Sequence, residues 1–170
     1  MINLRNLFSI PYRGFVGFID TSFIVGTFLK LIEKDNWRVV IKEDRRLREL
    51  NEPNCLLLIN DLNVYEIKSK LIRNYNVPFS KIDQLYDEGI RVFRNIKKIE
   101  PPIIKINNSL INWMLENDLD FKDGILIDIA QKFKLPFITS ERNARTWKKA
   151  YDGVMSQKEF WNKLKEYSPR

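Results

Sequence analysis

Histidine is absent from this 170-residue chain, and cysteine occurs only once. Without histidine, imidazole acid–base catalysis, Ser-His-Asp and Cys-His nucleophile systems and histidine metal sites are all excluded. The single cysteine, Cys55, lies in the apolar run CLLLI. This position favours a core residue over a reactive thiol. A single cysteine excludes a disulfide framework or cysteine zinc site and indicates a reducing compartment. Any catalysis must therefore use carboxylates, amines, hydroxyls or a bound ion.

Long apolar runs are also missing. No run approaches the roughly 20 residues that a membrane helix needs. The first residues, MINLRNLFSIPYRG, contain only the short apolar stretch LFSI, which is too little for a signal peptide. We therefore expect a soluble, cytoplasmic protein without membrane association. The length predicts one domain, with residues 1–14 as an N-terminal extension and residues 151–170 as a C-terminal strand or loop plus a helix.

Basic residues outnumber acidic ones, with 29 Lys and Arg against 22 Asp and Glu and a net charge of +7. This balance suits a polyanionic partner without proving one. In ERNARTWKKAY, Arg142, Arg145 and Lys149 recur at helical spacing, and Trp147 and Tyr151 are candidates for stacking on bases. The same spacing is equally typical of a solvated amphipathic helix whose aromatic residues face the core.

Strand-like and helix-like segments alternate along the chain. The expected strands are 15–19, 55–59, about four residues within 100–106, and 136–140. The expected helices begin at Asp20 and otherwise span 62–75, 80–98, 108–117, 120–134 and 157–167. Parallel neighbouring strands need crossover helices. The order therefore predicts the α/β class, as a three-layer α/β/α fold with a mainly parallel central sheet.

Acidic residues follow or flank several of the expected strands, and functional groups collect at the carboxyl ends of strands in open parallel sheets. Asp20 closes the first strand and Glu141 lies just past the last, whereas Asp123 is in the first turn of the preceding helix and Glu66 is about two turns into another. Each has a structural alternative: a helix cap for Asp20, a first-turn acid for Glu141 and for Asp123 after an Asp120 cap, and an ordinary solvated residue for Glu66.

Three motifs carry a resemblance to a known family. They are IDTSFIV (19–25), LNVYEI (62–67) and DGILIDIAQKFKLPFITSE (123–141). In the last, an acid opens a helix, alanine follows seven residues later, and a strand ends in threonine with an acid two residues beyond. Over roughly residues 15–150 the chain resembles a PIN domain, a metal-dependent ribonuclease fold, and more particularly the VapC type of toxin ribonuclease.

The resemblance implies a role for each acid. Asp20 and Asp123 would be metal ligands, and Glu66 would act through metal-bound water. Glu141 stands where the family usually has aspartate, so it is a departure from the pattern. The small hydroxyl positions that help to order such a site are matched by Thr21 or Ser22 and by Thr139.

The same resemblance implies a cofactor, an activity and partners. Clustered carboxylates repel one another unless a cation binds among them, and oxygen-only ligands favour Mg²⁺ or Mn²⁺. The implied function is hydrolysis of RNA phosphodiesters by metal-activated water, as the toxin of a toxin–antitoxin pair. The alternatives are a PIN nuclease of RNA maturation or decay and a noncatalytic RNA-binding protein. We expect RNA, an antitoxin and a second copy of the chain as partners, with the 80–98 or 157–167 helix as a dimer surface.

Overall fold

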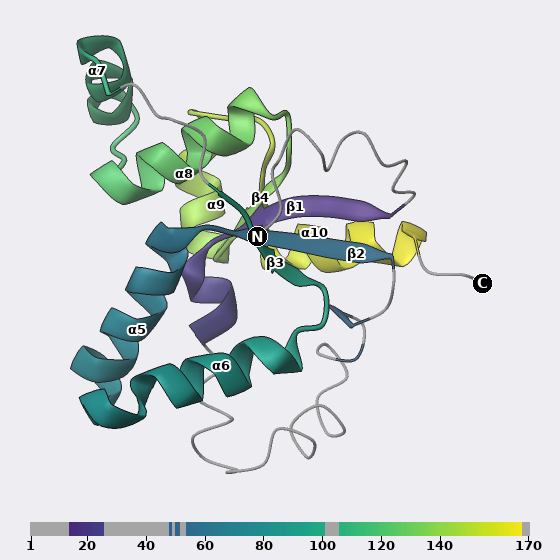
Figure 1. The fold of residues 1–170 in the computed structure, drawn as a ribbon. Coiled ribbons are helices and arrows are strands. Elements are labelled where there is room, and N and C mark those ends of the chain that lie inside the picture. Colours follow the sequence, from purple (N-terminus) through teal and green to yellow (C-terminus); the bar gives the residue numbers. More distant parts are fainter. Residues whose placement is uncertain (1–13, 26–47, 49, 52–53, 101–105, 168–170) are drawn as a thin grey trace.

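A five-stranded sheet forms the centre of the computed structural model, which describes residues 14–25, 48, 50–51, 54–100 and 106–167 (Figure 1). The strand order is β3-β2-β1-β4-β5, and every neighbouring pair is parallel. The strands are β1 (Phe15–Ile19), β2 (Cys55–Ile59), β3 (Ile96–Lys98), β4 (Phe137–Thr139) and β5 (Val154–Ser156). The predicted parallel α/β class is confirmed, and β1 and β2 have the predicted bounds.

Helices cover both faces of this sheet. They are α5 (Asp61–Tyr75), α6 (Ile82–Val92), α7 (Asn108–Glu116), α8 (Phe121–Lys132), α9 (Glu141–Trp147) and α10 (Gln157–Leu164), and residues 21–25 are also helical. Alternate residues of a strand point to opposite faces. Ile19 and Leu57 accordingly pack with α5, α6 and α10, whereas Phe18 and Leu58 pack with α7, α8 and α9. The two apolar clusters make the fold a three-layer α/β/α arrangement.

The strand order contains one switch point, between β1 and β4. From β1 the chain proceeds to β2 and β3 in one direction across the sheet, and β4 and β5 then lie on the other side. Crevices at such points, outside the carboxyl ends of the strands, are where open α/β sheets bind ligands. Asp20 lies there, because its backbone N–H donates to the carbonyl of Ile138 in β4 at 2.8 Å.

The predicted helix 80–98 is wrong at its end. Helix α6 stops at Val92, and β3 begins only four residues later. The cause lies outside the segment: the side-chain amide of Asn51 donates to the Val92 carbonyl, and its Oδ1 accepts from the Arg94 N–H, both at 2.8 Å. These bonds replace helical ones, so the chain turns into the sheet. Of the region predicted as the third strand, residues 101–105 lie outside the described residues.

The two helices expected to form a dimer surface contribute to the core of the chain. Phe160 and Leu164 of α10 are buried, as are Ile82 and Val92 of α6, and all belong to the same intramolecular cluster. These four side chains are therefore not available to a second copy. The other apolar residues of the two helices are only partly buried, so the dimer stays a prediction. None of the helices in the described segments is long and apolar enough to cross a membrane.

Candidate active site

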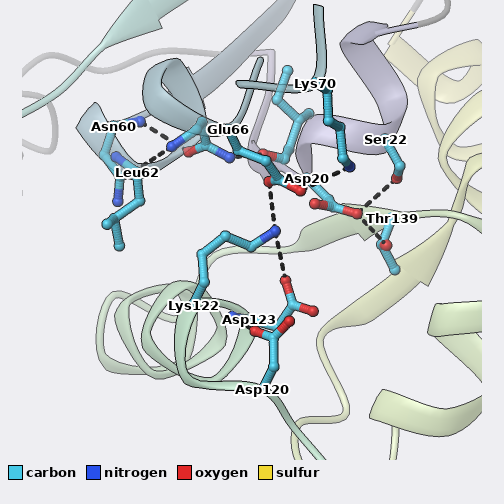
Figure 2. A network of polar contacts seen from close by, with 12 residues as sticks. Asp20, Ser22, Asn60, Leu62, Glu66, Lys70, Asp120, Lys122, Asp123 and Thr139 are labelled. Carbon is cyan, nitrogen blue, oxygen red and sulfur yellow. Dashed lines mark hydrogen bonds and ion pairs between the residues drawn. The ribbon is translucent and has the colours of Figure 1, made fainter. Parts of the chain in front are cut away.

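Asp20 is the first acid of the candidate site, and two hydroxyl groups orient its side chain. Its side chain follows β1 and is almost fully buried, at 3% exposure. Its Oδ2 accepts hydrogen bonds from the hydroxyl of Ser22 at 2.6 Å and from that of Thr139, the last residue of β4, at 2.9 Å (Figure 2). The hydroxyl contacts expected from Ser22 and Thr139 are therefore present. They orient a buried carboxylate at the switch point of the sheet.

Helix α5 brings Glu66 to the same region. The helix begins with a capping box in which Asn60 and Asn63 bond to each other's backbone N–H groups. The Asn63 amide also donates to the carbonyl of Ile19 at 3.1 Å, which fastens the first turn of α5 to the end of β1. Residues three apart share a helix face, so Glu66 faces the same way as Asn63. Its side chain is only 16% exposed, and the alternative of an ordinary solvated glutamate is wrong.

Helix α8 supplies the third acid. Asp120 caps the helix by accepting a hydrogen bond from the backbone N–H of Asp123 at 2.8 Å, so the predicted cap is confirmed. Asp120 itself is exposed, whereas the Asp123 side chain is 13% exposed and its Oδ1 is buried. Asp123 is therefore more than a first-turn acid favoured by the helix dipole, because its carboxylate lies in the same polar region as Glu66 (Figure 2).

A lysine lies between two of the acids. The Lys122 ammonium is 2.5 Å from Oε2 of Glu66 and 3.1 Å from Oδ1 of Asp123 (Figure 2). The other oxygen of Glu66, Oε1, is 2.7 Å from the ammonium of Lys70. Glu66 thus has a cation at each oxygen. Sequence reasoning missed Lys122, although one signal was present: lysine in the first turn of a helix opposes the helix dipole, so such a residue needs a local anionic partner.

These contacts shift the ionisation of the cluster. Burial, with Asp20 and Asp120 adding to it, raises the pKa of Asp123 to about 6, against the lowering effect of Lys122. Burial also opposes ionisation of Glu66, but hydrogen bonding to Lys122, Lys70 and Thr21 holds its pKa below the ordinary value. The pKa of Lys122 is raised by Glu66, Asp123 and Asp20 despite its burial. At neutral pH the site therefore contains charged carboxylates and a charged ammonium.

The cluster offers oxygen donors to a divalent ion, but not a finished metal site. Within the described residues, no group of three or more Asp, Glu, Cys or His side chains is arranged to hold a metal. Two buried oxygens nevertheless lie at the cluster: Thr21 Oγ1, beside Glu66, and Asp123 Oδ1, whose partner among the described residues is the Lys122 ammonium at 3.1 Å. Oxygen donors of this kind suit Mg²⁺ or Mn²⁺. Glu141 begins α9, but the structure does not describe its side chain, so its expected role stays a prediction.

The basic residues predicted to bind RNA are exposed on and after α9. Arg142, Arg145 and Lys149 all point to solvent, as both interpretations of this segment required. The position of Trp147 distinguishes the two interpretations. Trp147 is 6% exposed and packs against Phe137, at 6.2 Å between ring centroids. Its ring faces the core, so Trp147 is not available to stack on a base.

Comparison with known proteins supports the fold and goes no further. No protein-family model and no curated protein sequence matches this chain. The crystal structure of PAE2754 from Pyrobaculum aerophilum is similar, with a TM-score of 0.57 over 90% of this chain and 98% of that one. The sequences are 14% identical. At that identity the similarity concerns the α/β architecture and carries no residue roles.

Proposed function

We propose that this chain is a Mg²⁺- or Mn²⁺-dependent endoribonuclease that hydrolyses RNA phosphodiesters. One observation carries the proposal: Asp20, Glu66 and Asp123, from three separate segments, lie partly or fully buried in one polar region at the switch point of a parallel sheet. Burying several carboxylates together is unfavourable without cations. Binding a hard cation would offset this cost, and the oxygen donors of the cluster suit such an ion.

Each residue has a distinct task in this proposal. Asp20 and Asp123 would hold the ion, and Glu66 and Glu141 would orient water around it. The ion, when bound, supplies an acidified water and neutralises charge on the reacting phosphate. The hydroxyls of Ser22 and Thr139 keep the Asp20 carboxylate in one orientation. A carboxylate held by two hydroxyls needs little reorganisation when the ion binds.

The proposed substrate is RNA because of charge near the cluster. Helix α9 starts directly after β4, whose last residue, Thr139, contacts Asp20. Arg142 and Arg145 on that helix are exposed and would contact backbone phosphates, which supply most of the nonspecific affinity of such complexes. The finer assignment, a toxin restrained by an antitoxin, rests on the VapC-like motifs alone.

Cleavage of a fluorogenic RNA, with MnCl₂ or with EDTA, tests the activity. We expect cleavage only with the ion, and a loss of about a hundredfold or more in Asp20→Asn and Asp123→Asn, as for loss of an essential metal ligand. Asp128→Asn is the matched control, because Asp128 is on α8, is 14% exposed and pairs with Lys132. Full activity in either of the first two variants, or cleavage in EDTA, would contradict the proposal.

Toxicity is tested separately. Expression of the wild-type chain in a bacterial host should arrest growth, and Asp20→Asn should relieve the arrest at an equal protein level. A ribonuclease that acts in RNA maturation or decay would cleave RNA in vitro without arresting growth. The two outcomes therefore separate the toxin from the other PIN-type nuclease.

A noncatalytic RNA-binding protein is a second candidate, and one contact favours it. Because Lys122 already lies between Glu66 and Asp123, the cluster has a cation of its own. This candidate predicts RNA binding without cleavage at any Mn²⁺ concentration. It also predicts that Asp20→Asn binds RNA as well as the wild type or slightly better, since the variant removes a negative charge.

A further inference from the structure

The cation that lies among the acids belongs to the protein itself. Lys122 contacts Glu66 at 2.5 Å and Asp123 at 3.1 Å, and these are two of the side chains assigned above to the divalent ion. Its side chain is 25% exposed, less than that of Lys70 at 35%. The ammonium therefore lies inside the cluster and bridges helices α5 and α8 (Figure 2).

A count of charges shows what a divalent ion would change. The cluster contains the carboxylates of Asp20, Glu66 and Asp123, and the ammonium groups of Lys70 and Lys122. Three negative charges against two positive ones leave one uncompensated negative charge. A divalent ion would reverse the sign of this charge if both lysines stayed. If one lysine withdraws, the cluster with its ion becomes neutral.

Lys122 is the lysine that must withdraw. Its ammonium touches one oxygen of Asp123, an expected ligand, and one oxygen of Glu66, which would orient the water of the ion. An ion held by Asp123 would therefore meet the ammonium at close range. Lys70 contacts the other oxygen of Glu66 and can remain there. Like charges at such distances repel strongly in a partly buried site.

We propose that Lys122 is a built-in competitor of the divalent ion: its ammonium fills the metal-free site, and the ion binds by displacing it toward solvent. The inference rests on the proposed function and concerns the regulation of the same site. The ion pairs of Lys122 stabilise the metal-free cluster, and the same pairs weaken the affinity for the ion. The lysine stem is long and flexible, so the ammonium can swing out without moving the backbone of α8.

Calorimetric titration with MnCl₂, without RNA, tests the competition. Lys122→Met keeps the aliphatic length and removes the charge, so it should bind Mn²⁺ about tenfold or more tightly than the wild type. Lys70→Met is the matched control, since it removes a contact to Glu66 alone, and its gain should be much smaller. Equal affinity in the wild type and Lys122→Met would overturn the inference and leave the nuclease proposal standing. Failure of both to bind Mn²⁺ would remove the nuclease proposal and the inference with it.

A second measurement uses the wild-type protein and needs no variant to fold. Reductive methylation followed by mass spectrometry reports how accessible each lysine is. Lys122 should be modified slowly in EDTA and faster in saturating MgCl₂, whereas Lys132, which is 57% exposed and pairs with Asp128, should not change. Unchanged modification of Lys122, with Mg²⁺ binding shown by calorimetry on the same sample, would overturn the inference.

Discussion

Asp123→Asn should remove a specific pH dependence of stability from the metal-free protein. Burial raises the pKa of Asp123 to about 6 in the folded state, against 3.8 for an unperturbed aspartate. The folded protein therefore holds this proton more tightly than the unfolded chain does. Protonation of Asp123 stabilises the fold, and this stabilisation is complete below the unfolded pKa and lost as the pH rises through about 6.

The size of the effect follows from the two pKa values. Near pH 5 the proton on Asp123 contributes on the order of 1 kcal/mol to the free energy of unfolding, and near pH 7.5 it contributes almost nothing. The Asp123 side chain is only 13% exposed, so solvent screening takes little from this figure. The chain has no histidine, so no imidazole titrates in the same interval. The lowered pKa of Glu66 does not affect stability over this interval, because the stability that it contributes is lost only at more acidic pH.

Urea unfolding followed by far-UV circular dichroism, in EDTA at about pH 5 and about pH 7.5, measures the effect. The free energy of unfolding of the wild type should fall by on the order of 1 kcal/mol more than that of Asp123→Asn over this interval. Asp128→Asn lies five residues further along α8 and pairs with Lys132, so it should behave as the wild type does. Parallel pH dependences for the wild type and Asp123→Asn would refute the reasoning, because Asp123 would then titrate alike in both states.

Other parts of the structure give further expectations. Thr139→Val removes the hydroxyl that donates to buried Asp20, so it should lower the free energy of unfolding by about 1–3 kcal/mol in chemical denaturation. Ser22→Ala should lower it by less, because the Ser22 hydroxyl is less buried. Asn51→Ala loses both bonds that end α6 and should lower the free energy of unfolding by about 1–3 kcal/mol, whereas exposed Asn74 changed to alanine should not. Arg142→Gln with Arg145→Gln should weaken RNA binding in a filter assay and reduce its salt dependence, without lowering the melting temperature. Trp147→Ala should destabilise the fold by about 3–5 kcal/mol, because the ring is part of the core.

Local sequence patterns were sufficient to predict the elements that are determined by their own residues. Strands β1 and β2 are compact apolar runs, and their predicted bounds agree with the structure. The boundary between α6 and β3 was not predictable in this way, because Asn51 ends the helix from more than 40 residues away. The three-residue strand β5 is too short to show a period of two, and its hydrogen-bonded place beside β4 depends on tertiary packing.

The same division applies to the candidate site. Asp20 was found by a topological rule, since a residue that closes a central parallel strand must lie at the ligand-binding edge. The burial of Glu66 was not evident, because the residue lies off the main apolar stripe of α5 and is covered from α8, a helix distant in sequence. Lys122 was missed for the same reason: its significance arises only when the fold brings Lys122 of α8 to Glu66 of α5, a helix on the other face of the sheet. Sequence identified the acids, and packing determined which cations they meet.

Lys122 also places stability and ion binding in opposition. The free energy that stabilises the metal-free cluster is the free energy that an incoming ion must overcome, because both depend on the same oxygens of Glu66 and Asp123. Replacing Lys122 by methionine should therefore lower the melting temperature in EDTA and raise the temperature shift that Mn²⁺ produces. A protein whose only role is to bind RNA would show the first effect without the second. The pair of measurements thus distinguishes a lysine that merely neutralises buried acids from one that holds a place for a divalent ion.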